Sequence, residues 1–157
     1  MTISLEVPVR FMDRKRMQGS NEYFRDRVKE EVQRVRRYPS FVSLLSFDLS
    51  HINTNDEIEN FDNLEQFYSA LKQLIAHSVR ETDLISDIYN GKISILLIET
   101  PKEGASILLD RLKKSLKYFL CNNTKSPANW RVPSSEASYP DQNNDETGFI
   151  SAISDIN

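Results

Sequence analysis

Few residues in this chain have the types and spacing that chemistry requires. Asp48 ends an apolar stretch, and Arg80 precedes Asp83 by three positions, a spacing at which a cation and a carboxylate can pair at a helix end. A carboxylate can bind a hard metal ion, but only together with further oxygen ligands. Cys121 has no neighbouring His or acid that would activate its thiol. By position alone, these residues favour ordinary structural roles.

Helices and strands alternate around these residues. Apolar residues recur at helical spacing in three stretches, and short apolar runs between them predict strands. The predicted helices cover residues 20–37, 64–79 and 102–119, and the predicted strands cover 41–49, 83–89, 92–99 and, weakened by Pro133, 130–139. Residues 121–129 are expected to form a polar loop, and 147–156 at most a short helix. This order predicts an α/β (α+β) domain with a mixed sheet and helices packed against it.

The strongest local signal is Asn90-Gly91, between the second and third predicted strands. A type I′ turn needs positive φ at both central residues, and Asn-Gly is the pair that adopts it most readily. The sequence therefore predicts a tight hairpin at this point.

Composition excludes several classes of protein. A chain of 157 residues with 39% hydrophobic and 27% charged residues fits one globular domain. Its four glycines exclude the glycine-rich phosphate loops of Walker and dinucleotide-binding proteins, and its single cysteine excludes disulfide frameworks and Cys-rich zinc sites. No apolar run is long enough to span a membrane and no signal peptide opens the chain, so we expect a cytoplasmic protein without a membrane partner.

Charge is distributed unevenly along the chain. Residues 1–40 hold ten Lys and Arg against six acids, whereas the whole chain has a net charge of −3. The basic residues of the first helix alternate with acids and few aromatic residues lie between them, which favours a solvated helix face over a nucleic-acid site. We expect residues 1–19 to form a basic lead-in or linker and residues 20–157 to form the domain.

Four stretches resemble the GGDEF (diguanylate cyclase) domain. The first is RRYPS followed by SLLSFDLSHI, which is similar to that family's D-[IV]-D-H-F strand. The second is RETDLISDIYNGKISILLIETPKEGA, similar to the R-x-x-D site, signature hairpin and following helix start. DRLKK and ASYP resemble later segments. The resemblance covers roughly residues 10–140 and implies a nucleotide-cyclase-like, mainly antiparallel central sheet flanked by helices.

Departures from the family pattern imply a catalytically inactive domain. In the family, the signature acids and the first aspartate of D-x-D hold two metal ions on GTP. Here the signature positions are Tyr89, Asn90, Gly91, Lys92 and Ile93. Lys92 brings a positive charge where cations should bind. Ser50 replaces the second strand acid, so Asp48 is the lone remaining family metal-ligand position. We therefore expect no metal site, no cofactor and no cyclase activity.

The retained residues imply a receptor. Arg80 and Asp83 match the family's inhibitory R-x-x-D site, and Arg111 lies where the third helix supplies a further arginine. In the family, this site binds the guanines of cyclic di-GMP, because Arg can donate to O6 and N7 while Asp accepts from N1–H and N2–H. Two interpretations remain open: a cyclic di-GMP receptor, or a protein-interaction or dimerisation module in a signalling protein that binds no nucleotide. A protein partner or a homodimer fits the second.

Overall fold

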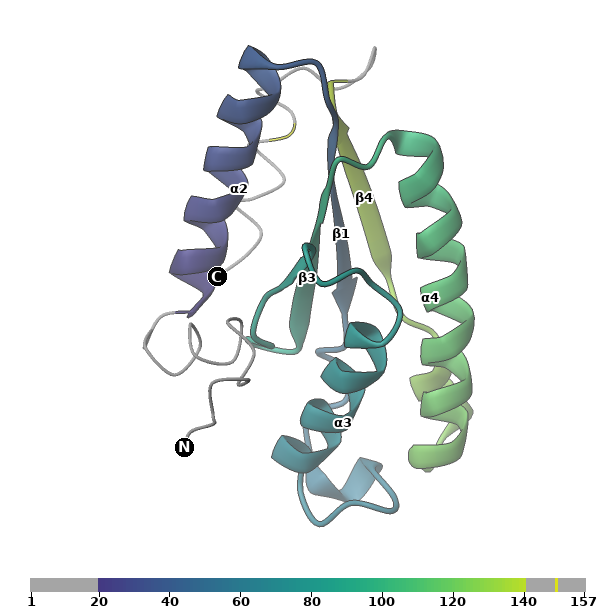
Figure 1. Ribbon diagram of the computed structural model, residues 1–157. Helices are drawn as coiled ribbons and strands as arrows, with labels where there is room; N and C mark the ends of the chain where they lie inside the picture. The colour runs from purple at the N-terminus through teal and green to yellow at the C-terminus, as the bar shows by residue number, and fades with distance from the viewer. Residues whose placement is uncertain (1–19, 141–148, 150–157) are drawn as a thin grey trace, which may run out of the picture.

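The computed structural model describes residues 20–140 and residue 149. Four strands form one sheet in the order β2-β3-β1-β4, and every neighbouring pair is antiparallel (Figure 1). The elements follow the chain in the order α2 (Ser20–Arg37), β1 (Val42–Asp48), η1 (Asn55–Glu57), α3 (Leu64–Ala76), β2 (Leu84–Ile85), β3 (Lys92–Ile98), α4 (Lys102–Asn123), η2 (Pro127–Trp130) and β4 (Ser134–Tyr139). The predicted fold class is confirmed.

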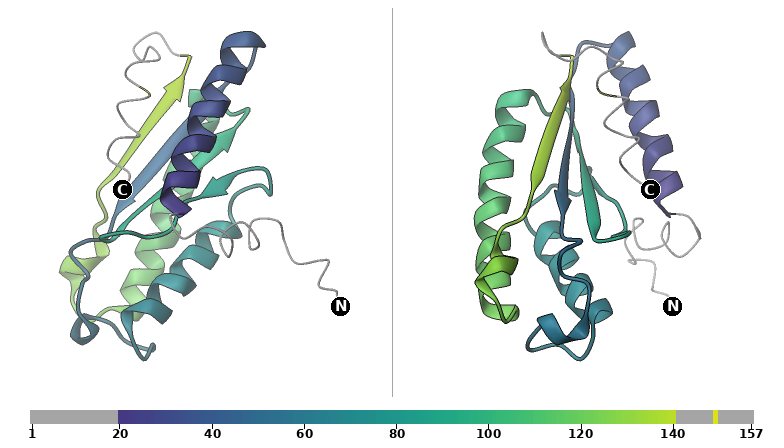
Figure 2. Two further views of the ribbon diagram at one scale, coloured as in Figure 1. Left: turned by 90° about the vertical axis from the view of Figure 1, so that its left-hand side faces the viewer. Right: turned by 180° about the vertical axis from the view of Figure 1, so that it is seen from behind.

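Helices cover both faces of the sheet. Helix α2 lies on one face, and α3 and α4 lie on the other (Figures 1 and 2). Alternate residues of the two central strands point to opposite sides, so Leu44 and its partner Leu96 pack under α2, while Leu45 and its partner Ile95 pack under α3 and α4. A strand with both faces buried reads as a continuous apolar run, which is why residues 41–49 show no clear alternation.

The core under α3 and α4 is the larger of the two. Phe67, Leu71 and Ile75 form the buried side of α3, and a stripe of leucines forms the buried side of α4. Phe67 also packs edge-on against Phe61, with ring centroids 5.8 Å apart. These contacts hold the two helices that frame the candidate site.

The hairpin at Asn90-Gly91 has the predicted type I′ geometry. Asn90 and Gly91 have φ values of 54° and 78°, and Tyr89 and Lys92 exchange both backbone hydrogen bonds at 3.0 Å. The first strand of this hairpin is shorter than predicted, since β2 contains only Leu84–Ile85 rather than residues 83–89.

A serine side chain explains the short strand. The N–H of Ser94 donates to Ser86 Oγ at 2.8 Å, although the N–H of Ser86 still donates to the Ser94 carbonyl. The N–H of Asp87 then donates to Asn21 Oδ1 on α2 instead of to a strand partner. The side-chain bond replaces a ladder bond and the pairing shifts by one residue before the turn, so regular pairing ends at Ile85.

The region after the third helix also differs from the prediction. Helix α4 continues through residues 121–123, which were expected to be loop, and Thr124 then ends it by donating from Oγ1 to the Leu120 carbonyl at 2.6 Å. The predicted strand at 130–139 is present from Ser134 to Tyr139. Pro133 lies just before it, where its carbonyl accepts from the Asp48 N–H at 3.0 Å.

Some predictions concern the ends of the chain. The linker at residues 1–19 and nearly all of the helix at 147–156 lie outside the described residues. Phe149 is described, and its ring packs 6.2 Å from that of Tyr139 in the core under α2. Within the described residues, no helix combines the length and apolar character needed to cross a membrane.

Candidate functional site

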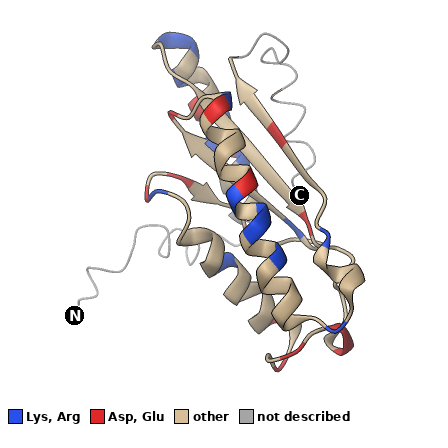
Figure 3. Cartoon of the chain, turned by 90° about the vertical axis from the view of Figure 1, so that its right-hand side faces the viewer, with Lys and Arg blue, Asp and Glu red and all other residues tan. Residues whose placement is uncertain are grey.

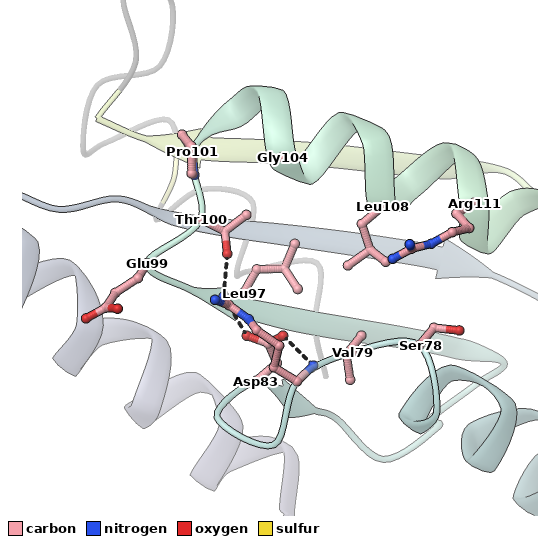
Figure 4. A pocket seen from close by; sticks show the side chains of 11 residues that line it. Ser78, Val79, Asp83, Leu97, Glu99, Thr100, Pro101, Gly104, Leu108 and Arg111 are labelled. Carbon is pink, nitrogen blue, oxygen red and sulfur yellow. Dashed lines mark hydrogen bonds and ion pairs between the residues drawn. The ribbon is translucent and has the colours of Figure 1, made fainter.

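An open pocket of about 330 Å³ lies between the loop after α3, the end of β3 and the first half of α4 (Figure 4). It brings together the three residues that the family resemblance implied as ligand-binding, although Arg111 is far from Arg80 and Asp83 in the sequence. The lining consists of Ser78, Val79, Arg80, Asp83, Leu97, Glu99, Thr100, Pro101, Gly104, Leu108 and Arg111.

Asp83 ties the loop to the end of β3. Its carboxylate accepts the Arg80 N–H on Oδ2 at 2.9 Å and the Ile98 N–H on Oδ1 at 3.0 Å. The residue is 2% exposed, so these bonds satisfy a carboxylate that is shielded from water. Asp83 therefore has a structural role whether or not a ligand binds.

Arg80 lies over the same corner with more than half of its side-chain surface in solvent. Nη2 donates to Thr100 Oγ1 at 2.7 Å and to the Ile98 carbonyl, and it lies 3.5 Å from Asp83 Oδ1. This is the helix-end ion pair that the i,i+3 spacing allows. The Arg80 side chain is 56% exposed, so the pair contributes little to stability.

Arg111 enters the pocket from α4. It follows Gly104 and Leu108 at spacings that place all three on one side of the helix, and Figure 4 shows its side chain beside Leu108. Arg111 forms no ion pair within the described part of the chain. The pocket thus holds two arginines and two acids, Asp83 and Glu99, of which Asp83 is committed to backbone donors.

The positions that correspond to the family signature form a separate surface around the hairpin turn. In the β1–β3 register Asp48 is paired with Lys92. Asp48 Oδ1 accepts the Ser50 N–H at 2.9 Å. Hydrogen bonding from the Ser50 side chain is the main cause that lowers the pKa of Asp48; burial opposes it, and the Ser50 backbone bond and the charges of Lys92 and His51 add to the lowering.

The turn itself is held close to this aspartate. The N–H of Leu49 donates to the Gly91 carbonyl at 2.7 Å. A side chain at Gly91 would lie 2.5 Å from the Ser50 Cα, so only glycine fits there. The residue paired with Asp48 in the β1–β3 register is thus a lysine rather than a second carboxylate.

His51 and Cys121 are two further residues of types that could take part in chemistry. His51 Nε2 lies 3.3 Å from the Asn129 carbonyl, and Cys121 is exposed. In the part of the chain that the structure describes, no three His, Cys, Asp or Glu side chains gather as a metal site would require.

Sequence reasoning missed the contribution of Thr100. Its hydroxyl accepts from Arg80, and it precedes the Pro101 that caps α4. The E-T-P-K-E-G segment between β3 and α4 is the signal that could have indicated a pocket wall, because a strand end, a helix start and a glycine meet there.

No protein family model matches this chain. Among curated proteins it is similar to the uncharacterized membrane protein YdaK of Bacillus subtilis, with 28% identity over 98 residues, which are 62% of this chain and 35% of that protein. The chain thus spans about a third of the length of that relative.

Solved structures show the fold. A DGC protein from Thermotoga maritima has a TM-score of 0.61 at 14% identity, covering 87% of this chain and 92% of that one. The fold is that of GGDEF domains. PelD from Pseudomonas aeruginosa in complex with c-di-GMP has a TM-score of 0.54 at 19% identity, covering 88% of this chain and 47% of PelD. The active GGEEF domain of a diguanylate cyclase from Vibrio cholerae has a TM-score of 0.51 at 16% identity, covering 81% and 76%.

Proposed function

We propose that this chain is a catalytically inactive regulatory domain of the GGDEF type that binds cyclic di-GMP through Arg80, Asp83 and Arg111. The observation that carries the proposal is the pocket itself, which is lined by two arginines from different elements together with Asp83. Similarity of fold to PelD, which has been seen in complex with c-di-GMP, supports the choice of ligand.

The proposed binding chemistry is guanine recognition by charged groups. An arginine can donate two hydrogen bonds to O6 and N7 of guanine, and the phosphates of the ligand favour a second cation nearby. Nη2 of Arg80 must leave Thr100 Oγ1 and the Ile98 carbonyl before it can bind a ligand, since both acceptors now hold this one nitrogen. Binding therefore exchanges internal hydrogen bonds of Arg80 for ligand bonds. The Asp83 oxygens already accept the N–H groups of Arg80 and Ile98, so Asp83 can accept from guanine only through its remaining lone pairs.

The proposed inactivity rests on charge at the signature turn. Two divalent cations on a triphosphate require several carboxylate ligands, whereas the pairing of Asp48 with Lys92 brings a fixed positive charge beside the one aspartate. The turn residues Tyr89, Asn90 and Gly91 supply no carboxylate. Incubation with GTP and Mg²⁺ should give no cyclic di-GMP, and product formation would refute this part of the proposal.

Calorimetric titration with cyclic di-GMP tests the receptor function. The wild-type chain should release or absorb heat on binding, and Arg80→Ala and Arg111→Ala should each weaken binding by at least about tenfold, the loss expected for one charge-assisted hydrogen bond. Lys114→Ala is the matched control, because Lys114 is an exposed cation on α4 that does not line the pocket. Circular dichroism should show that all three variants remain folded.

Absence of heat with a folded wild-type protein would refute the receptor function and favour a protein-interaction or dimerisation module. One feature supports that second candidate. Ile107 and Tyr118 of α4 are 67% and 74% exposed, which is unusual for large apolar side chains on one helix. Light scattering would then show whether the chain self-associates, and Tyr118→Ser should abolish that association.

A further inference from the structure

A second pocket lies beside the later part of α4, and the proposed function does not use it. Its volume is about 370 Å³, within the range of small-molecule sites. It is lined by Lys113, Lys117, Pro127, Trp130, Arg131 and Val132. No acidic residue is among the described residues of this lining, although the whole chain has a net charge of −3.

The three cations of this pocket come from two elements. Lys113 and Lys117 are one turn apart on α4, so they share one side of the helix, while Arg131 follows η2. Figure 3 shows basic segments along the middle of α4. None of the three forms an ion pair within the described residues, and their mutual repulsion is therefore uncompensated by a protein carboxylate.

Trp130 is among the residues that line the pocket. Its Nε1–H is buried and has no hydrogen-bond partner, one of two such side-chain nitrogens in the described part of the chain. Buried donors are nearly always paired, so this unpaired N–H is an unusual feature of a residue that lines the pocket.

Backbone hydrogen bonds fix the segment that carries Trp130 and Arg131. The N–H of Lys125 donates to the Glu57 carbonyl at 3.0 Å, and at the other end the Pro133 carbonyl accepts from Asp48. Between them, Ser126 caps η2 by accepting the Ala128 N–H. A cationic segment held at both ends loses little freedom on binding, which favours a preformed site.

We propose that this pocket binds a small multivalent phosphate anion. Lys113, Lys117 and Arg131 supply both the positive charge and the hydrogen-bond donors. Three unpaired cations around one hollow suit a ligand with several negative oxygens better than a single carboxylate, because each oxygen can take a charge-assisted hydrogen bond. The phosphate can be free in solution or part of a lipid headgroup, and the chemistry of recognition is the same.

The test uses the full chain and two probes. Inorganic pyrophosphate is titrated calorimetrically and by fluorescence, since Trp130 is the single tryptophan and reports directly from the pocket. Co-sedimentation with phosphatidylcholine vesicles, with and without phosphatidylinositol phosphate, tests the lipid source. Saturable pyrophosphate binding with a change in Trp130 emission supports a free ligand, and sedimentation only with the phosphorylated lipid supports a headgroup.

Substitutions then locate the site. Lys113→Gln combined with Lys117→Gln should weaken binding of the successful probe by at least about tenfold, because two charge-assisted bonds are lost. Lys114→Gln, an exposed lysine of the same helix outside the lining, should change it by less than about twofold if binding is local, since an exposed charge acts only weakly through solvent.

Three results would overturn the proposal: no binding of either probe, binding that survives the double substitution, or an equal loss in the Lys114 control. Because neither Lys113 nor Lys117 lines the pocket of Arg80, these results are independent of the cyclic di-GMP experiment.

Discussion

Substitution of Gly91 by alanine should destabilise the fold more than any other exchange in the hairpin turn. Gly91 has a φ of +78°, and a Cβ there would lie 2.5 Å from Ser50 Cα and 2.6 Å from Ser50 N. Real Cβ atoms do not approach backbone so closely, so either the hairpin or the segment after β1 must move.

The magnitude follows from two costs and one gain. The left-handed conformation costs an L-residue about 1–2 kcal/mol. Displacement of packed backbone adds about 1–3 kcal/mol. The reduced freedom of alanine in the unfolded chain returns about 0.4–1 kcal/mol. We expect Gly91→Ala to lower the free energy of unfolding by about 1–4.6 kcal/mol, with about 3 kcal/mol near the middle of this range, against the 5–15 kcal/mol that is typical of a domain.

Urea unfolding measures this change. With a slope of about 1.5 kcal/mol per molar, a loss of about 3 kcal/mol moves the midpoint down by about 2 M. Far-UV circular dichroism and Trp130 fluorescence should give the same midpoint if unfolding is two-state.

Asn90→Ala is the matched control. Asn90 also has a positive φ, 54°, but its side chain is exposed, so alanine there pays only the conformational cost of about 1–2 kcal/mol. The difference between the two variants isolates the contact with Ser50. Equal losses, or a loss below about 1 kcal/mol for Gly91→Ala, would show that this close approach does not constrain the turn.

Two further predictions concern the aspartates. Asp83→Asn should cost about 1–3 kcal/mol in urea unfolding, because one oxygen that accepts a backbone N–H from Arg80 or Ile98 becomes a donor in a buried site; an unchanged midpoint would contradict the tie to β3. The lowered pKa of Asp48 means that its ionised form stabilises the folded state. This contribution is present above the unfolded pKa of about 3.9 and is lost as pH falls through the lower folded pKa, so wild type and Asp48→Asn should converge in stability in acid. A constant difference from pH 7 to strong acid would refute it.

Local signals predicted most of the fold. Asn90-Gly91 determined its turn because the two residues that require positive φ are adjacent in sequence. The first helix ended where predicted, before Tyr38-Pro39. The two central strands followed from apolar runs buried on both faces, whereas the mainly antiparallel character of the sheet came from the family resemblance.

The failures came from side chains that bond to the backbone. The hydroxyl of Ser86 took the Ser94 N–H and shortened β2, and no propensity distinguishes such a serine from an ordinary strand residue. Likewise Asn123 donates to the Phe119 carbonyl at 2.8 Å and helps to prolong α4 into residues that composition alone assigns to a loop.

The candidate site was only partly predictable for a similar reason. The pairing of Arg80 with Asp83 is local and could be read from spacing, but the Asp83 bond to the Ile98 N–H joins residues that are distant in sequence. The convergence of Arg111 on this corner came from family resemblance, not from periodicity. Thr100 carries no motif of its own, and its role depends on where α4 begins.

Helix α4 contributes residues to both pockets, on different sides of the helix. Its buried stripe of leucines occupies one side, Gly104, Leu108 and Arg111 lie along one border of that stripe, and Lys113 and Lys117 lie on the other. At about 100° per residue, the two groups of cations point in roughly opposite directions from the helix axis. The cations that line one pocket therefore point away from the other, and basic residues that look like a single cluster in the sequence line two different pockets. The separation of the basic residues at 111–117 onto two sides of the helix is visible only in the structure and not in the order of the sequence.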